Sequence, residues 1–514
     1  MRSMYSNVSR SANSRLIPRL VLAAILLIGI ALRLFYLGEI RGNPDFDHPA
    51  IDAGYHYYWA RGITTGNWEA PEGRDDPQIY LHPFYRPPGY AYFLAAIYRL
   101  FGVGFLAPRL VQMLLGLLAA GGAYLIGKRW FGGAAGLIWS GLMAVYWIFI
   151  FYEGELAGES LSVLLGLPLL WAIAEAGEGR GWARGLIAGV LFGLYALLRP
   201  NVLVFFPVAV GWIIWVAMRR PATGMGRTQG SPLHFNGAGG PDDATESPVR
   251  GAWITAAAAA LGTALAIAPA TIRNYVVSGE FVPIATNVGI TVAVANNELT
   301  DGTTHIIPGI GDIGEPFEYP RIVRQLERNL GRSLTHQAAA NYLVGLGVAF
   351  ARDHPGKFWK LLGRKALLFW GPYEIRNLKE THYVRLNSPV LRSIPLNFPL
   401  VFALGVLGAA LFFIGWWGEE KRRSLAPLAP LARTIARAAR WDDRSPSTGS
   451  GSLGRRTMAE GQSDHSLLST PYSRSSQRQF DIAVLLVLFI IMYFLSMVAF
   501  AAADRYRIPL IPFL

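Results

Sequence analysis

The residues best suited to chemistry lie in one polar stretch, 38–104, of an otherwise strongly apolar chain. Asp52, Tyr55 and His56 follow one another at i, i+3 and i+4, so a helix would present all three on one face. A carboxylate beside aromatic side chains can act as a general base when desolvation or a neighbouring charge brings its pKa toward the working pH. The same aspartate could instead cap a helix beginning at His-Pro-Ala-Ile-Asp, and the sequence leaves both interpretations open.

A second candidate in this stretch is Arg86, which stands directly before two prolines. The prolines fix the backbone after the arginine, and a guanidinium held in one direction suits a phosphate better than a mobile lysine does. The alternative is a rigid turn entering the helix predicted at 89–101, with the arginine reaching lipid headgroups.

Three glutamates, Glu153, Glu155 and Glu159, stand at the mouth of an apolar run. Carboxylates at that depth are costly unless they are wet or paired. Glu159 lies nearest the apolar run that follows, so we expect it to face an interior cavity. A solvated helix start, which favours acidic residues, is the alternative.

Arginines form a fourth group, each at the predicted outer end of a membrane span: Arg199, Arg273, Arg505 and Arg507. Cations at these ends run against the usual bias of basic residues toward the cytoplasm. A bound polyanion at the outer leaflet would explain them, and so would contact with lipid headgroups.

The elements that must position these residues belong to a membrane protein. The chain has 514 residues, of which 52% are hydrophobic and 16% charged, and a mean hydropathy of +0.30. Repeated apolar runs of about 20 residues predict a polytopic all-α membrane protein. There is no cysteine, which excludes disulfides and thiolate chemistry. Much of the net charge of +13 lies in loops beside the spans, so it does not indicate nucleic acid.

The hydropathy pattern predicts nine spans and a short tenth, with a retained signal anchor first: 20–36, 110–125, 133–152, 161–173, 185–198, 202–218, 253–272, 399–417 and 482–503, then 508–514. Residues 1–19 are placed in the cytoplasm, 89–101 along the outer interface, and 20–272 in a membrane core that includes the outer loop 38–104. Residues 219–250 are predicted to be a flexible cytoplasmic loop, and 273–397 an outer domain with helical pattern between 320 and 370. The C-terminal part, 398–514, is predicted to carry a disordered basic loop at 418–479.

Several segments stand out by their order and spacing: HPAIDAGYHYYWA, FYRPPGYAYFLAAIYRLFG, APRLVQMLLGLLAAGGAYLIGKRWFG, YEGELAGESL, LLRPN, APATIRNYVVSGEFVPIATNVG and RYRIPLIPF. Together they resemble the GT-C superfamily of polyprenyl-phosphate-sugar glycosyltransferases. The most similar branch is that of the bacterial proteins similar to protein mannosyltransferases and to the lipid A aminoarabinose and galacturonosyl transferases.

The resemblance implies a GT-C-like bundle of about nine or ten membrane helices with an outer interfacial helix and a small, mostly helical outer domain. It implies transfer of a sugar from a polyprenyl phosphate to an acceptor at the outer face, with inversion at the anomeric carbon. Asp52 matches the first-loop aspartate that acts as base, Arg86 the basic residue near the donor phosphate, and Glu159 the acid of the second outer loop. Many relatives have Asp-Glu where this chain has Asp52 followed by Ala53, so a metal-free enzyme is expected.

These expectations define the candidate site. The catalytic residues are Asp52 and Glu159, the donor phosphate is expected at Arg86, Arg273, Arg505 and Arg507, and substrate contacts are expected from Tyr55, His56, Tyr85 and Glu155. The expected partners are a polyprenyl-phosphate sugar, an unidentified acceptor and membrane lipids, in a multi-pass protein of the bacterial inner membrane. Two alternatives stay open: a flippase or transporter of lipid-linked saccharides, and an enzyme similar to O-antigen ligases.

Overall fold

The structure is a computed structural model that describes residues 2–179, 181–219, 248–313, 316–372, 380–425, 471–498 and 507–514. Most of the loops predicted at 219–250 and 418–479, and Arg505, lie outside the described residues. The chain divides into two compact units, 1–401 with 485–514, and 402–484. In the second unit the ring of Trp416 stacks on that of Phe480, with centroids 3.9 Å apart.

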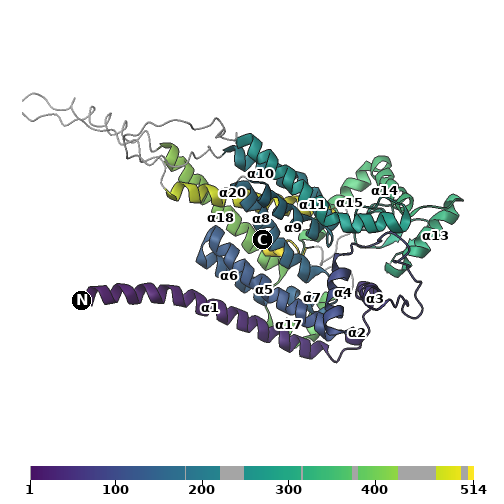
Figure 1. Ribbon diagram of the computed structural model, residues 1–514, viewed down its shortest axis with the longest axis horizontal. Helices are drawn as coiled ribbons and strands as arrows, with labels where there is room; N and C mark the ends of the chain where they lie inside the picture. Colours follow the sequence, from purple (N-terminus) through teal and green to yellow (C-terminus); the bar gives the residue numbers. More distant parts are fainter. Residues whose placement is uncertain are drawn as a thin grey trace, which may run out of the picture. The chain divides into compact units, whose positions relative to one another are not determined.

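Within the described residues, nine apolar elements correspond to the nine predicted spans (Figure 1). Seven are helices long and apolar enough to cross a membrane: α1 (Arg2–Ile40), α5 (Leu106–Phe131), α8 (Glu159–Glu178), α10 (Phe206–Arg219) with its preceding 3-10 turn η1 (Pro200–Phe205), α11 (Pro248–Ser278), α18 (Phe398–Leu425) and α20 (Pro471–Val498). An eighth is the bent pair α6 (Gly133–Val145) and α7 (Trp147–Gly154), and the ninth is the shorter α9 (Trp182–Ala196). The prediction of a polytopic all-α membrane protein is therefore confirmed. Which end of each span faces outward stays a prediction.

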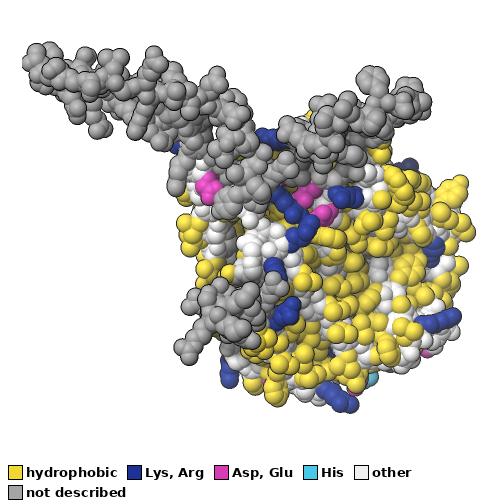
Figure 2. All heavy atoms as spheres, turned by 60° about the vertical axis from the view of Figure 1, so that its left-hand side comes forward, with side chains coloured by type: hydrophobic (Ala, Val, Ile, Leu, Met, Phe, Trp, Pro, Cys, Tyr) yellow, Lys and Arg dark blue, Asp and Glu magenta, His cyan; other side chains and the backbone are white. Residues whose placement is uncertain are grey.

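The face shown in Figure 2 is covered mostly by hydrophobic side chains. Leucines on α1 and α5 contribute to such exposure, for example Leu27, which is 65% exposed, and Leu125, which is 66% exposed. A soluble protein rarely leaves so much apolar surface uncovered, whereas lipid-facing helices must. The predicted tenth span at 508–514 is not helical in the usual sense, because the chain there forms a buried turn and the 3-10 helix η6 (Ile511–Phe513).

Small residues explain how the short helix α9 packs in the bundle. Gly185, Gly189 and Gly193 recur every four residues on the side that meets α11, and a Cβ at Gly189 would lie 2.0 Å from the carbonyl oxygen of Ala259. Thr263 of α11 donates to the carbonyl of Gly189 across the same contact, at 3.1 Å. Close backbone approach of this kind is how membrane helices associate without a hydrophobic driving force. It joins α9 firmly to α11, whose C-terminal end carries part of the candidate site.

An ion pair stabilises the break in the bent span. Arg33 of α1 donates from Nε and Nη2 to the carboxylate of Glu153 on α7, at 2.6 and 2.7 Å. Its Nη1 donates at 2.7 Å to the carbonyl of Ala144, which lies in the last turn of α6 before the break at Tyr146. Both charged side chains are almost fully buried. One guanidinium therefore bonds both halves of the bent span, and its charge is matched by a carboxylate.

Two segments of the first unit, 38–104 and 273–397, are predicted to lie outside the membrane. The first contributes α2 (Pro44–Asp47), α3 (Ile51–Thr65) and α4 (Gly89–Phe101); the second contributes α12 (Val288–Ala295), the hairpin β1 (Ile306–Ile307) and β2 (Gly311–Asp312), η2 (Pro316–Glu318), α13 (Tyr319–Leu330), α14 (His336–Asp353), α15 (Pro355–Trp370), α16 (Thr381–Asn387) and α17 (Pro389–Ser393). Aromatic and aliphatic side chains of both segments form one buried cluster, which includes Tyr58, Phe84, Phe317 and Leu326. Figure 1 shows α3, α4, α13 and α15 at the same end of the helix bundle.

We expect Arg33→Met to lower the free energy of unfolding by about 3 to 5 kcal/mol, because Glu153 would be left buried without its partner. The double variant Arg33→Met with Glu153→Met should recover most of the loss. Arg129→Met is the control, since the pair that Arg129 forms with Glu175 is exposed and should contribute less than about 1 kcal/mol. Thermal melting in detergent measures the three effects. An Arg33→Met variant that melts no lower than Arg129→Met would contradict the stabilising role of the ion pair between Arg33 and Glu153.

Lys365 on α15 gives a pH-dependent prediction. The side chain is 1% exposed and donates to Asn296 Oδ1 at 3.1 Å, and burial lowers its pKa to about 7 from 10.5. Between these two pH values the unfolded chain binds a proton that the folded chain lacks, so stability rises with pH from about 7 to 10 and the penalty is complete below 7. Lys365→Met should therefore stabilise the protein by about 2 kcal/mol at pH 6 and little at pH 10. Melting temperatures are measured at both pH values, with Lys357→Met, at an exposed position, as the control. The same change in melting temperature at pH 6 in Lys365→Met and Lys357→Met would refute the prediction.

Candidate active site

Asp52 and Arg86 form a two-pronged ion pair. Arg86 Nη1 donates to Asp52 Oδ2 at 3.1 Å, and Nη2 lies 2.9 Å from Oδ1. The aspartate side chain is 4% exposed, whereas the arginine is 24% exposed. The two residues that the sequence singled out for base and phosphate therefore meet, with the carboxylate inside and the guanidinium partly open to the outside. Such forked contacts fix the direction of both planar groups.

The start of α3 fixes Asp52. The helix begins at Ile51 with Ala50 at its N-cap position, so the interpretation of Asp52 as the capping residue is wrong. Ile51 adopts φ +53°, which is rare for a β-branched residue and marks local strain beside the Asp52 carboxylate. A Cβ at Gly54 would lie 2.6 Å from the carbonyl oxygen of Pro49, so only glycine permits the chain to fold this tightly under the helix start.

Hydrogen bonds from outside the loop hold the backbone before Arg86. The amide of Phe84 donates to Asn274 Oδ1 at 3.0 Å, and the carbonyls of Phe84 and Tyr85 accept from Thr286 and Asn287 at 2.9 and 3.0 Å. After the two prolines, the amide of Gly89 donates to the carbonyl of Leu197 at the end of α9. The loop is therefore fixed on both sides of the arginine.

Arg273 and Asn274, near the C-terminal end of α11, support this loop. Asn274 is fully buried, and its Nδ2 donates to the carbonyls of Val282 and Ile284. Arg273 donates to the carbonyls of Ile79 and His82 and lies over the ring of Phe84 at 4.1 Å. The structure thus shows Arg273 as a support of the Arg86 loop, and its contact with a donor phosphate stays a prediction.

Aromatic side chains surround the ion pair. Tyr85 stacks on Tyr319 with centroids 4.1 Å apart, and the Arg86 guanidinium lies 5.9 Å from the centre of the Tyr85 ring. Tyr319 in turn contacts His336 Nδ1 through its hydroxyl at 2.9 Å. Burial and the nearby His82 lower the pKa of His336 to about 4, so the imidazole is neutral and can accept this bond.

Tyr55 lies one helical turn after Asp52, as the predicted spacing requires. It is 1% exposed, and its hydroxyl has no hydrogen-bond partner among the described residues. Burial raises the pKa of Tyr55, so the hydroxyl stays protonated and remains a donor. A buried donor without a partner costs free energy, which a bound ligand can recover.

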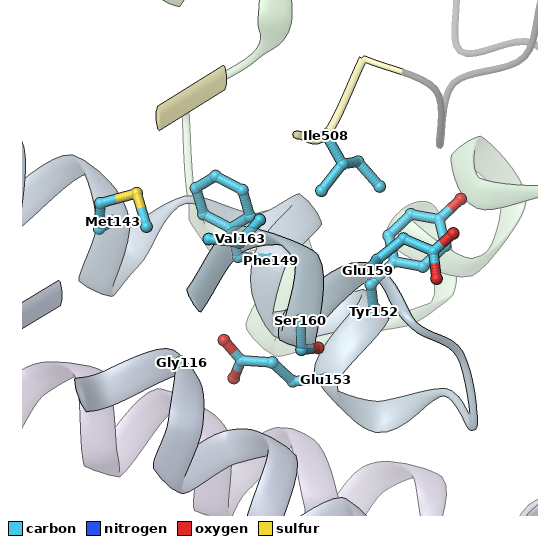
Figure 3. A pocket seen from close by; sticks show the side chains of 9 residues that line it. All are labelled: Gly116, Met143, Phe149, Tyr152, Glu153, Glu159, Ser160, Val163 and Ile508. Atoms are coloured by element: carbon cyan, nitrogen blue, oxygen red, sulfur yellow. The ribbon is translucent and has the colours of Figure 1, made fainter. Parts of the chain in front are cut away.

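The second predicted carboxylate, Glu159, begins α8 and is 2% exposed, so the interpretation as a solvated helix start is wrong. Arg199 Nη2 donates to Glu159 Oε1 at 2.6 Å. The other oxygen, Oε2, is buried and has no hydrogen-bond partner among the described residues. Glu159 also lines a cavity of about 10 Å³, room for about one water molecule, together with Glu153 and Ser160. In Figure 3 the carboxylate of Glu153 points toward Gly116 and that of Glu159 points the other way.

Tyr90 of α4 connects helix α3, which carries Asp52, with the loop before Glu159. Its ring meets that of His56 with centroids 4.9 Å apart, and its hydroxyl donates to Gln112 Oε1 at 2.6 Å. Gln112 donates in turn to the carbonyls of Glu153 and Glu155, and a Cβ at Gly158 would touch Tyr90. Glu155 therefore contributes its backbone to this network, and the loop before Glu159 is tied to α4 and α5. Glu155 lies in the short connection between α7, which ends at Gly154, and α8, which starts at Glu159.

Arg507 lies against the C-terminal end of α15. It is 2% exposed, donates to the carbonyls of Phe369 and Gly371 at the end of α15, and lies over the ring of Phe398. The next residue, Ile508, lines the cavity beside Glu159. Phosphate contact by Arg507 stays a prediction, and so does that by Arg505, which lies outside the described residues. In the described ranges no three His, Asp or Glu side chains gather to hold a metal, and metal dependence stays untested.

Sequence reasoning missed the residues that act as supports: Asn274, Gln112, Arg109 and Tyr90. Arg109, for example, donates to the carbonyls of Gly154 and Phe46 and so joins both outer loops. A polar residue inside an apolar run, as at Gln112, was the available signal, because such a side chain is costly in a membrane unless it is bonded.

One protein-family model matches part of the chain. Residues 85–225 match the family model of dolichyl-phosphate-mannose-protein mannosyltransferase. The matched segment contains Arg86, Tyr90, Glu159 and Arg199, whereas Asp52 lies before it. No curated protein matches the chain in sequence.

Solved structures of low sequence identity are similar to the chain. The oligosaccharyltransferase AglB from Archaeoglobus fulgidus, in complex with an inhibitory peptide and a dolichol-phosphate, is 12% identical with a TM-score of 0.43, and the match covers 97% of this chain and 50% of that one. ArnT from Cupriavidus metallidurans bound to undecaprenyl phosphate is 15% identical with a TM-score of 0.37, over 76% of this chain and 71% of that one. The chain therefore spans about half the length of the archaeal protein. Through residues 85–225 this chain resembles the protein mannosyltransferase family.

Proposed function

We propose that this protein is a membrane glycosyltransferase that moves a sugar from a polyprenyl phosphate to the hydroxyl of an acceptor, with inversion, at the outer face of a bacterial inner membrane. The observation that carries the proposal is the ion pair in which a buried Asp52 carboxylate meets the partly open Arg86 guanidinium. The name of the matched family, which specifies a dolichyl-phosphate-linked mannose, supports a polyprenyl-phosphate donor.

Asp52 is the proposed base. As the acceptor oxygen attacks the anomeric carbon, its proton passes to the carboxylate and the bond from that carbon to the phosphate oxygen breaks. An ionised carboxylate is needed for this step, and Arg86 is the cation that lies against it. The support at the helix start, where glycine at 54 permits the tight turn, keeps the base in place.

Arg86 is the proposed contact for the leaving phosphate. Negative charge grows on the phosphate as the sugar leaves, and a fixed cation beside it stabilises that charge without reorganising. Because the bonds from Asn274, Thr286 and Asn287 fix the loop before Arg86, the guanidinium is oriented before the donor arrives. The hydroxyl of Tyr55, buried beside the pair, is the proposed donor to a substrate oxygen.

Glu159 is the proposed second carboxylate. Arg199 binds one of its oxygens and leaves Oε2 available to a sugar or acceptor hydroxyl. Tyr90 and Gln112 link the loop before Glu159 to the helix that carries Asp52, and this link would hold the two carboxylates in one arrangement.

We expect Asp52→Asn to lower kcat by a factor of about 10² to 10⁴, because the amide keeps the shape but cannot accept the proton. Turnover is measured as release of labelled sugar from polyprenyl-phosphate sugars, offered as a panel in nanodiscs. Asp75→Asn is the control, since Asp75 lies in the same loop and pairs with the exposed Arg324. Unchanged turnover in Asp52→Asn would remove this residue as base, and transport of intact donor without turnover would favour the flippase.

Asn274→Ala tests the support of the loop. The variant removes the acceptor for the Phe84 amide and the donor to two carbonyls, so the direction of Arg86 should loosen. We expect kcat/KM for the donor to fall about tenfold or more, with little added loss when Arg86→Ala is combined with it. Ser278→Ala, one turn later on α11, should leave kcat/KM unchanged, because among the described residues its hydroxyl contacts only the backbone carbonyl of Asn274 and the amide of Glu280. Fully multiplicative losses in the double variant would show that Asn274 does not act through Arg86.

A further inference from the structure

Helix α15 (Pro355–Trp370) exposes an apolar stripe that no other described element covers. Trp359 is 68% exposed and Leu367 is 78% exposed, and with Gly363 between them they recur every four residues on one face. The opposite face is buried through Leu361, Lys365 and Phe369. Four basic residues among the 16 of this helix make it too polar to cross a membrane, and it is not among the apolar helices that could span one. A large exposed indole and a leucine on the same face of a helix indicate contact with something apolar.

The end of α15 joins the ends of two spans. The ring of Trp370 lies 6.2 Å from that of Phe398, the first residue of α18, and 5.3 Å from that of Phe494, in the last two turns of α20. Arg507 fixes the same point by donating to the carbonyls of Phe369 and Gly371. Phe398 begins α18 just before the apolar run predicted at 399–417, and Phe494 lies about one turn before Val498, the last described residue of α20. The C-terminus of α15 therefore lies beside the start of one predicted span and near the last described turn of another.

Basic residues flank the apolar stripe. Lys360 and Arg364 are exposed and lie one turn apart, and Lys357 precedes them. Arg364 makes only a 3.4 Å contact with Asp301, and Lys357 only a 3.8 Å contact with Glu298. Lys360 has no ion-pair partner within the described part of the chain. Positive charge beside an indole is the pattern of helices that lie in the headgroup region of a bilayer.

We propose that α15 lies in the headgroup region on the outer side of the membrane that the protein spans. Trp359 and Leu367 then lie among the upper acyl chains, and Lys360 and Arg364 contact the phosphates of anionic lipids. The partner surface is the lipid leaflet itself, chosen by the continuity of α15 with the span ends and by its charge. The helix would then fix the depth of the outer domain on the bilayer. This proposal does not depend on the glycosyl transfer proposed above.

The cysteine-free sequence allows a direct test. Trp359→Cys and Leu367→Cys, each labelled with an environment-sensitive fluorophore, are placed in nanodiscs that contain lipids brominated in the upper acyl chain. Arg328→Cys, on an exposed turn of α13, is the control. We expect the first two labels to lose at least half of their fluorescence and the control to lose less than a tenth. Equal quenching at all three sites, or none at 359 and 367, would overturn the placement of α15.

A second measurement tests the lipid headgroup. In labelled Trp359→Cys, brominated phosphatidylglycerol at a minor fraction should quench about twice as strongly as brominated phosphatidylcholine. That preference should disappear when Lys360→Gln and Arg364→Gln are added, whereas Lys357→Gln should reduce it less. In labelled Trp359→Cys without the glutamine substitutions, equal quenching by the two lipids would refute the contact with anionic lipids, because Lys360 and Arg364 would then not select headgroups.

Discussion

The contact between Asp52 and Arg86 depends on a polypeptide loop that has little structure of its own. Two prolines after Arg86 remove amide donors, and the loop gains its fixed shape from partners far away in the sequence. Asn274, 190 residues after Phe84, supplies one of these bonds, and the segment just after α11 supplies two more. The ion pair is thus a result of how the first outer loop rests on the end of a membrane helix. A buried carboxylate without that arrangement would be costly.

The membrane imposes the second constraint. In hydrocarbon every backbone carbonyl and every charge needs a partner, so a break in a span must be compensated from a neighbouring helix. Arg33 does so for the break at Tyr146, and Thr263 and the glycines of α9 provide the close contacts with α11. These internal contacts leave the outer ends of the spans as the place where polar side chains can gather around a substrate.

The sequence allowed the helices and part of the site to be predicted. Long apolar runs located the spans, the spacing of Asp52, Tyr55 and His56 predicted α3, and the helix expected at 89–101 has those bounds in the structure. The local signals were strong there because apolar periodicity and proline act within a few residues. Pairs such as Arg33 with Glu153, which are 120 residues apart, have no local signature. The break between α6 and α7 was missed for the same reason, since its stabilising partner lies on another helix.

The length of α9 has a consequence for the lipid around the protein. Fifteen helical residues extend about 22 Å, whereas the hydrocarbon layer is about 30 Å thick. This hydrophobic mismatch favours a locally thinned leaflet beside α9, as membranes adapt to short spans. Soon after α9 the chain reaches Arg199, which binds Glu159, so this pair lies where headgroups would dip below their usual level. An amphiphile with a charged group at that depth would come near Arg199, the more exposed partner of the pair at 15%, without leaving its leaflet.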